Sequence, residues 1–449
     1  MVVVRQHIVD IAPQRPAGQL GEATHRGKQL LLPGASSRVH AAAGRVPYDV
    51  IGEQRIDRRH VVRVERREQP SHDVLVRMHV ILLAHSSTGI DQRWAPDSSA
   101  RKRSRYAFAM ARRVPSLLGG SEEELLDLAR RGDHAAFEGV TGPYVRELHL
   151  HCYRMLGSLH DADDLLQETL LRAWRAIGRC ESRSSVRTWL YRIATNACLN
   201  ALAERPRRAL PSGLIPASDP DDPPREPILE PIWLEPYPDR LLEDLEDPAA
   251  RYARRETIEL AFLVAIQLLP PRQRAVLLLR DVVECSANEV AALLCTSRAS
   301  VNSALQRAKN TLGQRTFGEV APSEPTDEER ELLERYMRAF ARADVLELAR
   351  VLAEEVEMTM PSDPTWFRGR QNVIRFLEHG VFAVRGQIVV EPTGANCQPA
   401  VALYERGADG DSGLSVQVLT IVGGLIGGIT GFVDRNLFPS FGLQTERPR

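Results

Sequence analysis

Residues 161–177 read DADDLLQETLLRAWRAI, and this stretch determines how the first folded part of the chain is interpreted. Its apolar residues Leu166, Leu170, Trp174 and Ile177 recur three or four positions apart. That spacing places them on one face of an α-helix, because such a helix has 3.6 residues per turn. We therefore expect a long amphipathic helix that buries this face against neighbouring helices.

A second face of the same helix, here called the acidic helix, is charged. Asp161, Asp164 and Glu168 lie three and four residues apart, and Arg172 and Arg175 continue the charged surface. A face of this kind is usually only solvated. Spacing alone does not distinguish a solvated face from a protein-binding one.

Further helices flank the acidic helix. Ser121 and Glu124 form a capping box, which marks the start of a helix with Leu125, Leu128 and Ala129 on its apolar side. Two more helices are expected between this one and the acidic helix. The first patterned part of the chain is therefore predicted to be all-helical.

Another helix is expected after residue 185. Trp189, Leu190 and Ile193 give it an apolar face. Its opposite face carries arginine and asparagine side chains, which suit the phosphates and base edges of a nucleic acid. Arginine near a helix end also interacts favourably with the helix dipole, so this pattern alone does not establish binding.

Two of these segments resemble the sigma-70 family of RNA polymerase sigma factors, and the small helical parts resemble its extracytoplasmic-function group. The segments are DADDLLQETLLRAW at 161–174 and SSVRTWLYRIATN at 184–196. The resemblance implies a domain over 121–208 that docks on core RNA polymerase and opens the minus-ten promoter DNA. It assigns the polymerase contact to Asp161, Asp164, Leu165, Gln167 and Glu168. It assigns the DNA contact to Arg187, Trp189, Arg192 and Asn196.

A proline-rich acidic segment over 209–247 follows this domain. Eleven of the 43 positions from 206 to 248 are proline, so a helix cannot persist and an extended tether is expected. The tether also contains Trp233 and Tyr237. Two interpretations stay open: these rings pack on the protein's own domains, or the segment threads a groove in a partner, as the connector of the resembling family does in polymerase.

A second helical part is expected over 248–316. A long helix is predicted from 248 to 269, because Pro270 and Pro271 stop it there. The next helix is predicted over 272–282. We expect these helices to support the unit that follows.

That unit reads as a helix-turn-helix. Ser286 can cap its first helix, residues 295–297 form the turn, and the second helix runs over 298–312. Val301, Leu305, Ala308 and Leu312 are expected to be buried. The exposed side chains are short and polar at the helix start with cations later, as a DNA-recognition helix requires. They are Arg298, Ser300, Asn302, Ser303, Gln306, Arg307 and Lys309.

This part also resembles the sigma-70 family, in the domain that reads the minus-thirty-five promoter element. The matching segments are LLPPRQRAVLLLRD at 268–281 and VNSALQRAK at 301–309. The resemblance singles out Asn302, Ser303, Gln306 and Arg307 for DNA contact. Cys295 stands where many relatives have glycine at the turn, and a positive φ costs cysteine about 1 kcal/mol, so the turn is expected to differ.

The third part, over 326–443, is predicted to be an α+β domain. Thr326 and Glu329 form a capping box at the start of a helix, and several strand-like runs follow from residue 356 onward. Helices followed by a curved antiparallel sheet indicate a cone around a pocket. The stretches WFRGR at 366–370 and ANCQPA at 395–400 resemble the SnoaL-like domains appended to some extracytoplasmic-function sigma factors.

SnoaL-like domains include small-molecule cyclases and isomerases, so an enzymatic role has to be weighed. Catalysis would need an acid–base pair in an apolar pocket. The residues that could supply it are Glu357, Asp363, Glu378, His379 and Asp434, and no spacing pairs them. We expect a non-catalytic regulatory module that contacts the sigma domains, with a small-molecule ligand left open and no cofactor.

Residues 1–115 show no sustained helical or strand period. They carry 20 basic against 10 acidic residues, whereas the rest of the chain carries 38 against 49. One interpretation is a disordered basic arm that contacts nucleic acid through phosphates. We favour the other, an upstream extension from a mis-assigned start codon, with Met110 as the natural start.

Composition excludes several classes of protein. No run approaches the ~20 apolar residues of a membrane-spanning helix, and no secretory signal follows Met1. The six cysteines contain no CxxC pair, which argues against a disulfide scaffold or a zinc ribbon. His149, His151 and Cys152 are close in sequence, but positions i and i+2 diverge on a helix, so no metal site is expected. The pattern favours a cytoplasmic protein.

We therefore expect an alternative sigma factor rather than an enzyme, with two all-α parts followed by an α+β domain. Its expected partners are core RNA polymerase and promoter DNA, with no membrane contact. The alternatives are a SnoaL-like enzyme fused to a DNA-binding module and a regulator that never contacts polymerase. The sequence leaves a separate anti-sigma partner undetermined.

Overall fold

The computed structural model describes residues 121–179, 185–203, 207–222, 225, 228, 233–242, 257–313, 326–361 and 363–448. The predicted basic segment 1–115 and part of the predicted linker lie outside these ranges. Within them, no helix combines the length and the apolar character needed to cross a membrane.

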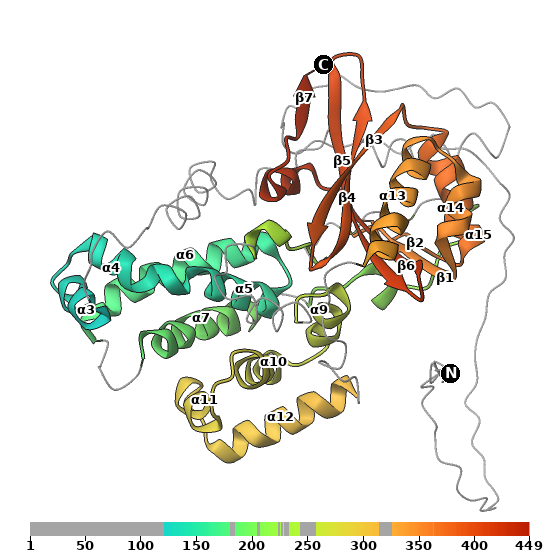
Figure 1. Ribbon diagram of the computed structural model, residues 1–449. Helices are drawn as coiled ribbons and strands as arrows, with labels where there is room; N and C mark the ends of the chain where they lie inside the picture. Colours follow the sequence, from blue (N-terminus) through green and yellow to red (C-terminus); the bar gives the residue numbers. More distant parts are fainter. Residues whose placement is uncertain are drawn as a thin grey trace, which may run out of the picture. The chain divides into compact units, whose positions relative to one another are not determined.

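The first part is a helical bundle, as predicted (Figure 1). Ser121 forms the predicted capping box with Glu124, because each side chain accepts a hydrogen bond from the other residue's backbone N–H. The prediction that Leu128 belongs to the apolar side of this helix was wrong, because the residue is 36% exposed. Leu126 is buried in its place, because the helix turns Leu126 and Ala129 into the core. This first bundle consists of α3 (Glu122–Arg130), α4 (His134–Thr141), α5 (Val145–Leu156), α6 (Leu159–Ala176) and α7 (Val186–Ala203).

Helix α6, the acidic helix, begins earlier than predicted and buries a slightly different face. It begins at Leu159 because the Ser158 hydroxyl accepts a hydrogen bond from the N–H of Asp161, at 3.1 Å. Within the predicted stripe, Leu170 and Trp174 are only half-buried. The face that packs between α5 and α7 consists of Ala162, Leu166, Thr169 and Ala173.

The second bundle contains the predicted helix-turn-helix. Its long first helix was predicted from 248, but residues 257–259 form a turn, and 248–256 lie outside the described residues. The carbonyls of Thr257 and Ile258 are hydrogen-bonded by the side chains of Arg154 and Asn396 instead of by a helix. The bundle consists of α9 (Leu260–Gln267), α10 (Pro271–Leu277), a π-helical turn (Leu278–Val282), α11 (Ala287–Leu293) and α12 (Arg298–Leu312).

The turn between α11 and α12 adopts the left-handed backbone at Cys295, where φ is 50°. We expected the cysteine to change this turn, but Cys295 instead adopts the positive φ that a glycine would take there. Ser297 then caps α12 by accepting a hydrogen bond from the N–H of Ser300 at 3.1 Å. The turn is therefore formed at some cost in backbone strain.

The C-terminal domain combines helices with one sheet, as predicted, but the predicted order is not kept throughout, because two strands come before its third helix. The helices are α13 (Asp327–Ala341), α14 (Val345–Val351) and α15 (Arg370–Phe376), and a π-helical turn follows over Leu377–Phe382. The strands are β1 (Leu352–Thr359), β2 (Trp366–Arg368), β3 (Ile388–Ala395), β4 (Gln398–Arg406), β5 (Gly410–Val422), β6 (Leu425–Phe432) and β7 (Glu446–Pro448).

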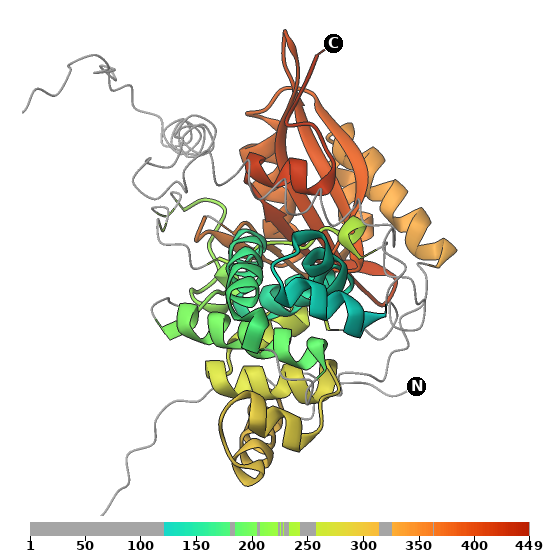
Figure 2. The same cartoon turned by 90° about the vertical axis from the view of Figure 1, so that its left-hand side faces the viewer.

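The sheet of this domain is almost wholly antiparallel. Its order is β2-β1-β6-β5-β4-β3, with β7 paired to β5, and β1 pairs in parallel with β6. Figure 2 shows the sheet curving, with the orange helices of this domain on one of its faces. Asn396 and Cys397 form the two-residue turn between β3 and β4, and both have a positive φ, as a tight hairpin turn requires.

We predict that Cys295→Gly stabilises the protein, because glycine adopts a positive φ without the Cβ penalty. The expected gain in the free energy of unfolding is up to about 1 kcal/mol, measured by chemical denaturation. The matched control is Thr296→Gly, one residue along at a position without positive φ, which should destabilise. A loss of stability in the Cys295 variant would contradict the prediction.

Candidate functional site

The predicted recognition helix α12 presents a continuous polar face. Its buried side is formed by Val301, Ala304, Ala308 and Leu312, whereas Leu305 is only half-buried. All seven residues predicted to face DNA are exposed: Arg298, Ser300, Asn302, Ser303, Gln306, Arg307 and Lys309. The helix therefore has a core-facing side and an opposite side available for a partner.

Some side chains of this polar face already have contacts within the chain. Lys309 forms an ion pair with Asp281 at 2.9 Å, and Gln306 donates a hydrogen bond to Asn310 at 3.0 Å. Among the described residues, Arg298 and Arg307 lie within ion-pair distance of no carboxylate. These two arginines are therefore the cations best placed to hold phosphates.

Helix α7 exposes only part of its predicted nucleic-acid face. Arg192 and Asn196 are exposed. Trp189 is only 4% exposed, so the prediction that it contacts DNA is not supported: the ring belongs to the apolar side of the same helix. Arg187 is held by the carboxylate of Glu147 through its Nε and Nη2 atoms, both at 2.9 Å.

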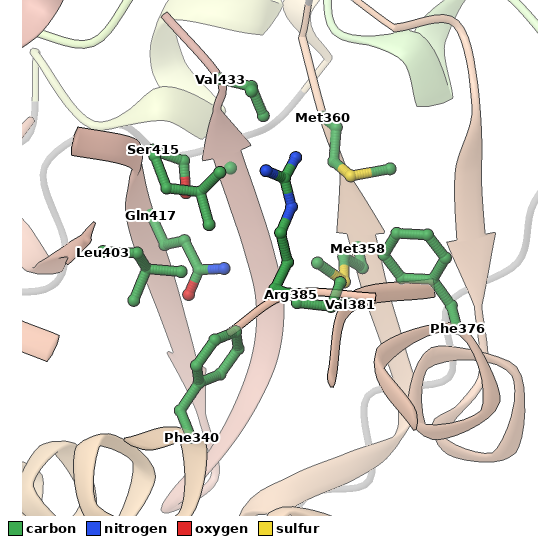
Figure 3. A pocket seen from close by; sticks show the side chains of 12 residues that line it. Phe340, Met358, Met360, Phe376, Val381, Arg385, Leu403, Ser415, Gln417 and Val433 are labelled. Atoms are coloured by element: carbon green, nitrogen blue, oxygen red, sulfur yellow. The ribbon is translucent and has the colours of Figure 1, made fainter. Parts of the chain in front are cut away.

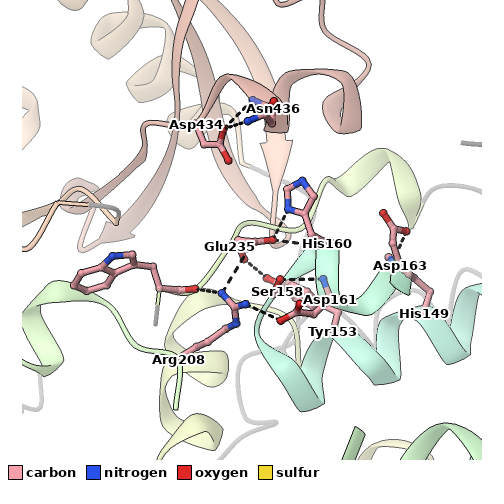
Figure 4. Close-up of polar contacts among 11 residues, drawn as sticks. His149, Tyr153, Ser158, His160, Asp161, Asp163, Arg208, Glu235, Asp434 and Asn436 are labelled. Atoms are coloured by element: carbon pink, nitrogen blue, oxygen red, sulfur yellow. Dashed lines mark hydrogen bonds and ion pairs between the residues drawn. The ribbon is translucent and has the colours of Figure 1, made fainter. Parts of the chain in front are cut away.

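The predicted polymerase-binding face of α6 is partly covered by the chain itself. Nη2 of Arg208 lies 2.6 Å from the carboxylate of Asp161, and the Arg208 side chain is only 10% exposed (Figure 4). Glu168 pairs with Arg172 at 2.7 Å, and Asp164 is exposed. Leu165 and Gln167 are half-buried. Asp161 is thus less accessible than the sequence pattern suggested.

The linker residues 233–242, here called the linker strap, pack on the first bundle. Trp233 and Tyr237 are buried. In this structure the two rings therefore pack on the protein's own domains and do not extend toward a groove in a partner. The Tyr237 ring lies 4.7 Å from that of Tyr153, and its hydroxyl is 2.9 Å from Nδ1 of His149. The N–H of Glu235 donates to the carbonyl of Gly157 at 3.0 Å.

Glu235 connects the strap to the start of α6 (Figure 4). Its carboxylate lies 2.9 Å from Nδ1 of His160 and also accepts the His160 N–H. Burial alone would raise the pKa of Glu235, but the hydrogen bond from His160 and the charges of His160 and Arg208 lower it to about 2. The same hydrogen bond raises the pKa of His160 to about 9, and the negative charges of Glu235, Asp434 and Asp163 add to this effect. Partial burial of the imidazole acts in the opposite direction and lowers its pKa.

The tip of the β3–β4 hairpin brings the three folded parts together. Asn396 is fully buried, and its Oδ1 accepts a hydrogen bond from the N–H of Tyr237 at 2.9 Å. Its Nδ2 donates to the hydroxyl of Tyr153 at 3.0 Å and to the carbonyl of Ile258 at 2.8 Å. One side chain therefore contacts the strap, the first bundle and the approach to the second bundle.

Neighbouring residues of the hairpin add to these contacts. The N–H of Cys397 donates to the strap residue Asp239 at 2.8 Å, and Gln398 accepts the first N–H of α9, that of Leu260, at 3.0 Å. Sequence reasoning assigned no role to Asn396 or Gln398. The signal available was a polar pair at a tight strand-to-strand turn, but nothing in the sequence indicates what the turn touches.

The residues considered for a metal site are used in packing. Nε2 of His151 lies 3.0 Å from the hydroxyl of Thr195, and burial and the nearby Arg154 lower the pKa of His151 to about 3. Nε2 of His149 lies 3.1 Å from the carboxylate of Asp163. In the part of the chain that the structure describes, no group of three His, Cys, Asp or Glu residues is arranged to hold a metal ion.

The residues considered for acid–base catalysis are absent from the lining of the cavity in the C-terminal domain. The C-terminal domain has a cavity of about 40 Å³, and its lining includes none of the five. Glu357 instead pairs with Arg368, the ring of His379 bonds to the Arg375 carbonyl, and Asp434 accepts hydrogen bonds from Asn436. The arrangement does not support a catalytic pair.

Two family models match the helical parts of the chain. The model described as Sigma-70 region 2 matches residues 142–208, and the model described as Sigma-70, region 4 matches residues 259–312. The first match covers most of the first bundle and the second covers the helix-turn-helix.

Similar proteins were also found among characterised sequences and solved structures. The chain is 43% identical over 318 residues to the ECF RNA polymerase sigma factor SigG of Mycobacterium tuberculosis, an alignment that covers 70% of this chain and 85% of that protein. It is 30% identical over 191 residues to the RNA polymerase sigma-H factor of Pseudomonas aeruginosa, which covers 42% of this chain and 91% of that protein. The crystal structure of the M. tuberculosis extracytoplasmic-function sigma factor SigJ covers 67% of this chain and 97% of its own, with 21% identity and a TM-score of 0.44.

We predict that the contact between His160 and Glu235 makes stability depend on pH. The raised pKa of His160 means that this contribution is complete below about pH 6.5 and is lost as the pH rises through about 9. His160→Gln keeps a hydrogen-bond donor without a titrating charge. The variant should be less stable than the wild type by up to about 1 kcal/mol near pH 6.5, and the two should converge above pH about 9.

The measurement is the thermal unfolding midpoint of both proteins across this pH range. The same comparison is made in proteins that carry Glu235→Gln. Without the Glu235 carboxylate, the His160→Gln substitution should have no pH-dependent effect on stability. A difference between wild type and His160→Gln that stays constant with pH would contradict the prediction.

Proposed function

Since the chain belongs to the extracytoplasmic-function group of sigma-70 RNA polymerase sigma factors, we propose that its C-terminal domain holds the two sigma regions in a closed state that must open for initiation. As a sigma factor, the chain binds core RNA polymerase and promoter DNA and directs promoter-specific transcription initiation. It is not itself an enzyme, because the polymerase carries out phosphoryl transfer. We assign it to the cytoplasm, where that polymerase and its DNA are found.

The DNA contacts that we propose follow the exposed polar faces. Helix α12 would enter the major groove of the minus-thirty-five element, with Asn302 and Ser303 near base edges and Arg307 on a phosphate. Arg192 and Asn196 of α7 would contact the minus-ten element. All of these residues are exposed, which supports the assignment.

The polymerase contact that we propose uses the acidic helix α6. Asp164 and Glu168 are the accessible carboxylates of its charged face, and Leu165 and Gln167 lie between them. Asp161 would join this surface only after Arg208 releases it. The contact with polymerase would therefore compete with the contact between α6 and the chain that follows α7.

The closed state conflicts with simultaneous contact to both promoter elements. Elements centred near positions −10 and −35 are about 25 base pairs apart, or roughly 85 Å on B-form DNA. In this structure α10 and α11 pack directly against α7, and buried Arg274 of α10 hydrogen-bonds to the carbonyl of Met155 at the end of α5. We infer that the two bundles separate when the chain engages a promoter.

Asn396 is the observation that carries the proposed role of the C-terminal domain. Its side chain makes three hydrogen bonds, one to the strap, one to the first bundle and one to the chain that leads into α9. Opening would break these bonds and expose a fully buried amide, so the domain favours the closed state. The domain would thereby lower sigma activity until it is displaced.

We predict that Asn396→Gly increases transcription. Glycine keeps the left-handed backbone of the turn, where φ is 58°, and removes all three side-chain hydrogen bonds. At about 1 kcal/mol for each bond, the closed state would lose roughly 3 kcal/mol. Reconstituted transcription with limiting sigma factor and core polymerase should rise by several-fold or more.

Cys397→Gly is the matched control for this variant. It lies next to Asn396 in the same turn with the same sign of φ, and its backbone N–H to Asp239 is retained. Its activity should stay near that of the wild type. If Asn396→Gly were equal to or below the wild type while this control was unchanged, the C-terminal domain would not restrain the sigma regions.

We also predict that Arg307→Ala weakens promoter binding by the holoenzyme. Loss of one phosphate contact should lower affinity on all promoter sequences and reduce the slope of log K against log salt by about one. Gel-shift titrations at several salt concentrations measure both effects. Arg338→Ala, an exposed arginine of α13 outside the sigma regions, is the control, and an unchanged salt slope for Arg307→Ala would contradict the assignment.

A further inference from the structure

The cavity of the C-terminal domain contains a buried guanidinium with an unused donor. Arg385 lines this cavity, and its side chain is only 4% exposed. Nη1 donates to the carboxylate of Glu405 at 2.8 Å, whereas Nη2 is buried and has no hydrogen-bond partner. A buried charged donor without a protein partner is costly, so an acceptor from outside the chain, a water or a ligand, has to complete the site.

The two other polar side chains around the cavity can also donate hydrogen bonds. Ser415 and Gln417 are both buried and alternate along β5, so they face the same side of the sheet. The carbonyl oxygen of Gln417 already accepts the hydroxyl hydrogen of Tyr336 at 2.7 Å, which leaves the amide nitrogen to donate. Figure 3 shows this nitrogen turned toward the side of Arg385. An acceptor-only ligand fits this set of groups.

Charge and size narrow the class of ligand. Glu405 offsets the charge of Arg385 but is itself 31% exposed and so partly hydrated, which leaves the cavity side of the guanidinium positive. The remaining walls are apolar and include Met358, Phe376 and Leu414. The volume of about 40 Å³ corresponds to roughly three water molecules. A carboxylate head with a very short hydrocarbon tail meets these conditions.

We propose that this cavity binds a short-chain carboxylate, with one carboxylate oxygen at Nη2 of Arg385 and the tail against Met358 and Phe376. This proposal names the class of ligand that the regulatory domain would bind. Its significance for transcription rests on the proposed regulatory role of the domain. The binding itself is a property of this cavity, and it can be tested without polymerase or DNA.

The test is calorimetric titration and thermal unfolding of the full chain with sodium acetate, against sodium chloride at equal ionic strength. Acetate should bind saturably and raise the unfolding midpoint. Acetamide, which has the same shape without the charge, should not. Equal binding of acetamide would overturn the anionic assignment, and equal binding of sodium nitrate would overturn the carboxylate assignment. No saturable acetate binding to the folded chain would overturn the proposal altogether.

Substitutions connect the binding to this cavity. Arg385→Lys keeps a cation beside Glu405 but lacks the second guanidinium donor, so acetate affinity should fall at least about tenfold. Arg406→Lys, which alters an exposed arginine paired with Asp411, is the matched control and should bind as the wild type does. Unchanged affinity in Arg385→Lys would contradict the proposed site.

A second variant keeps the test decisive if Arg385→Lys does not fold. Val433→Phe places a larger side chain at the cavity wall without altering any charge, and it should abolish acetate binding while circular dichroism stays native. Retained binding in that folded variant would overturn the assignment. Because neither readout involves transcription, failure here is distinguishable from failure of the Asn396→Gly experiment.

Discussion

The buried amide of Asn396 is the interaction on which the arrangement of this sigma factor depends. A fully buried amide must have its donors and its acceptor satisfied, because each unmet group costs about as much as a hydrogen bond contributes. Here the amide oxygen accepts a hydrogen bond from the linker strap. The amide nitrogen donates one hydrogen bond to the first bundle and another to the chain that enters α9. These bonds form together in the arrangement that the structure shows, and we propose that they restrain the two sigma regions.

Charge reinforces the same arrangement from the polymerase-binding side. Arg208 pairs with Asp161, a residue that the sigma-factor pattern assigns to polymerase. Arg208 also lies 3.7 Å from Glu235, which in turn pairs with His160 at the beginning of α6. The pair of His160 with Glu235 is partly exposed, and pairs of that kind contribute little individually. They are therefore suited to exchange for contacts with a partner, whereas the buried amide of Asn396 resists opening. We propose that the closed state is held by the buried contacts of Asn396, Arg274 and Arg208, and by the more exposed pair of His160 with Glu235.

Much of the secondary structure and the main functional faces could be predicted from sequence. The capping boxes at Ser121 and Thr326 and the polar face of α12 follow from local residue order, since caps and helical periodicity act over three or four residues. The errors came where distant contacts override local preference. The sequence pattern assigned Trp189 both to the apolar face of its helix and to the DNA contact. In the structure its side chain is buried in the core. Residues 257–259 left the predicted helix because Arg154 and Asn396 bind their carbonyls.

Local residue order was enough to identify two helical sigma regions, a helix-turn-helix and an α+β domain, because motifs and periodicities are local properties of the chain. The three-dimensional contacts were needed to show that the strap packs inward, that Asp161 pairs with Arg208 and that the Asn396 turn reaches both bundles. They also showed that Arg385 has an unused donor inside an apolar cavity. These features join residues that are 20 to 243 positions apart, and local spacing contains no information about which of them meet.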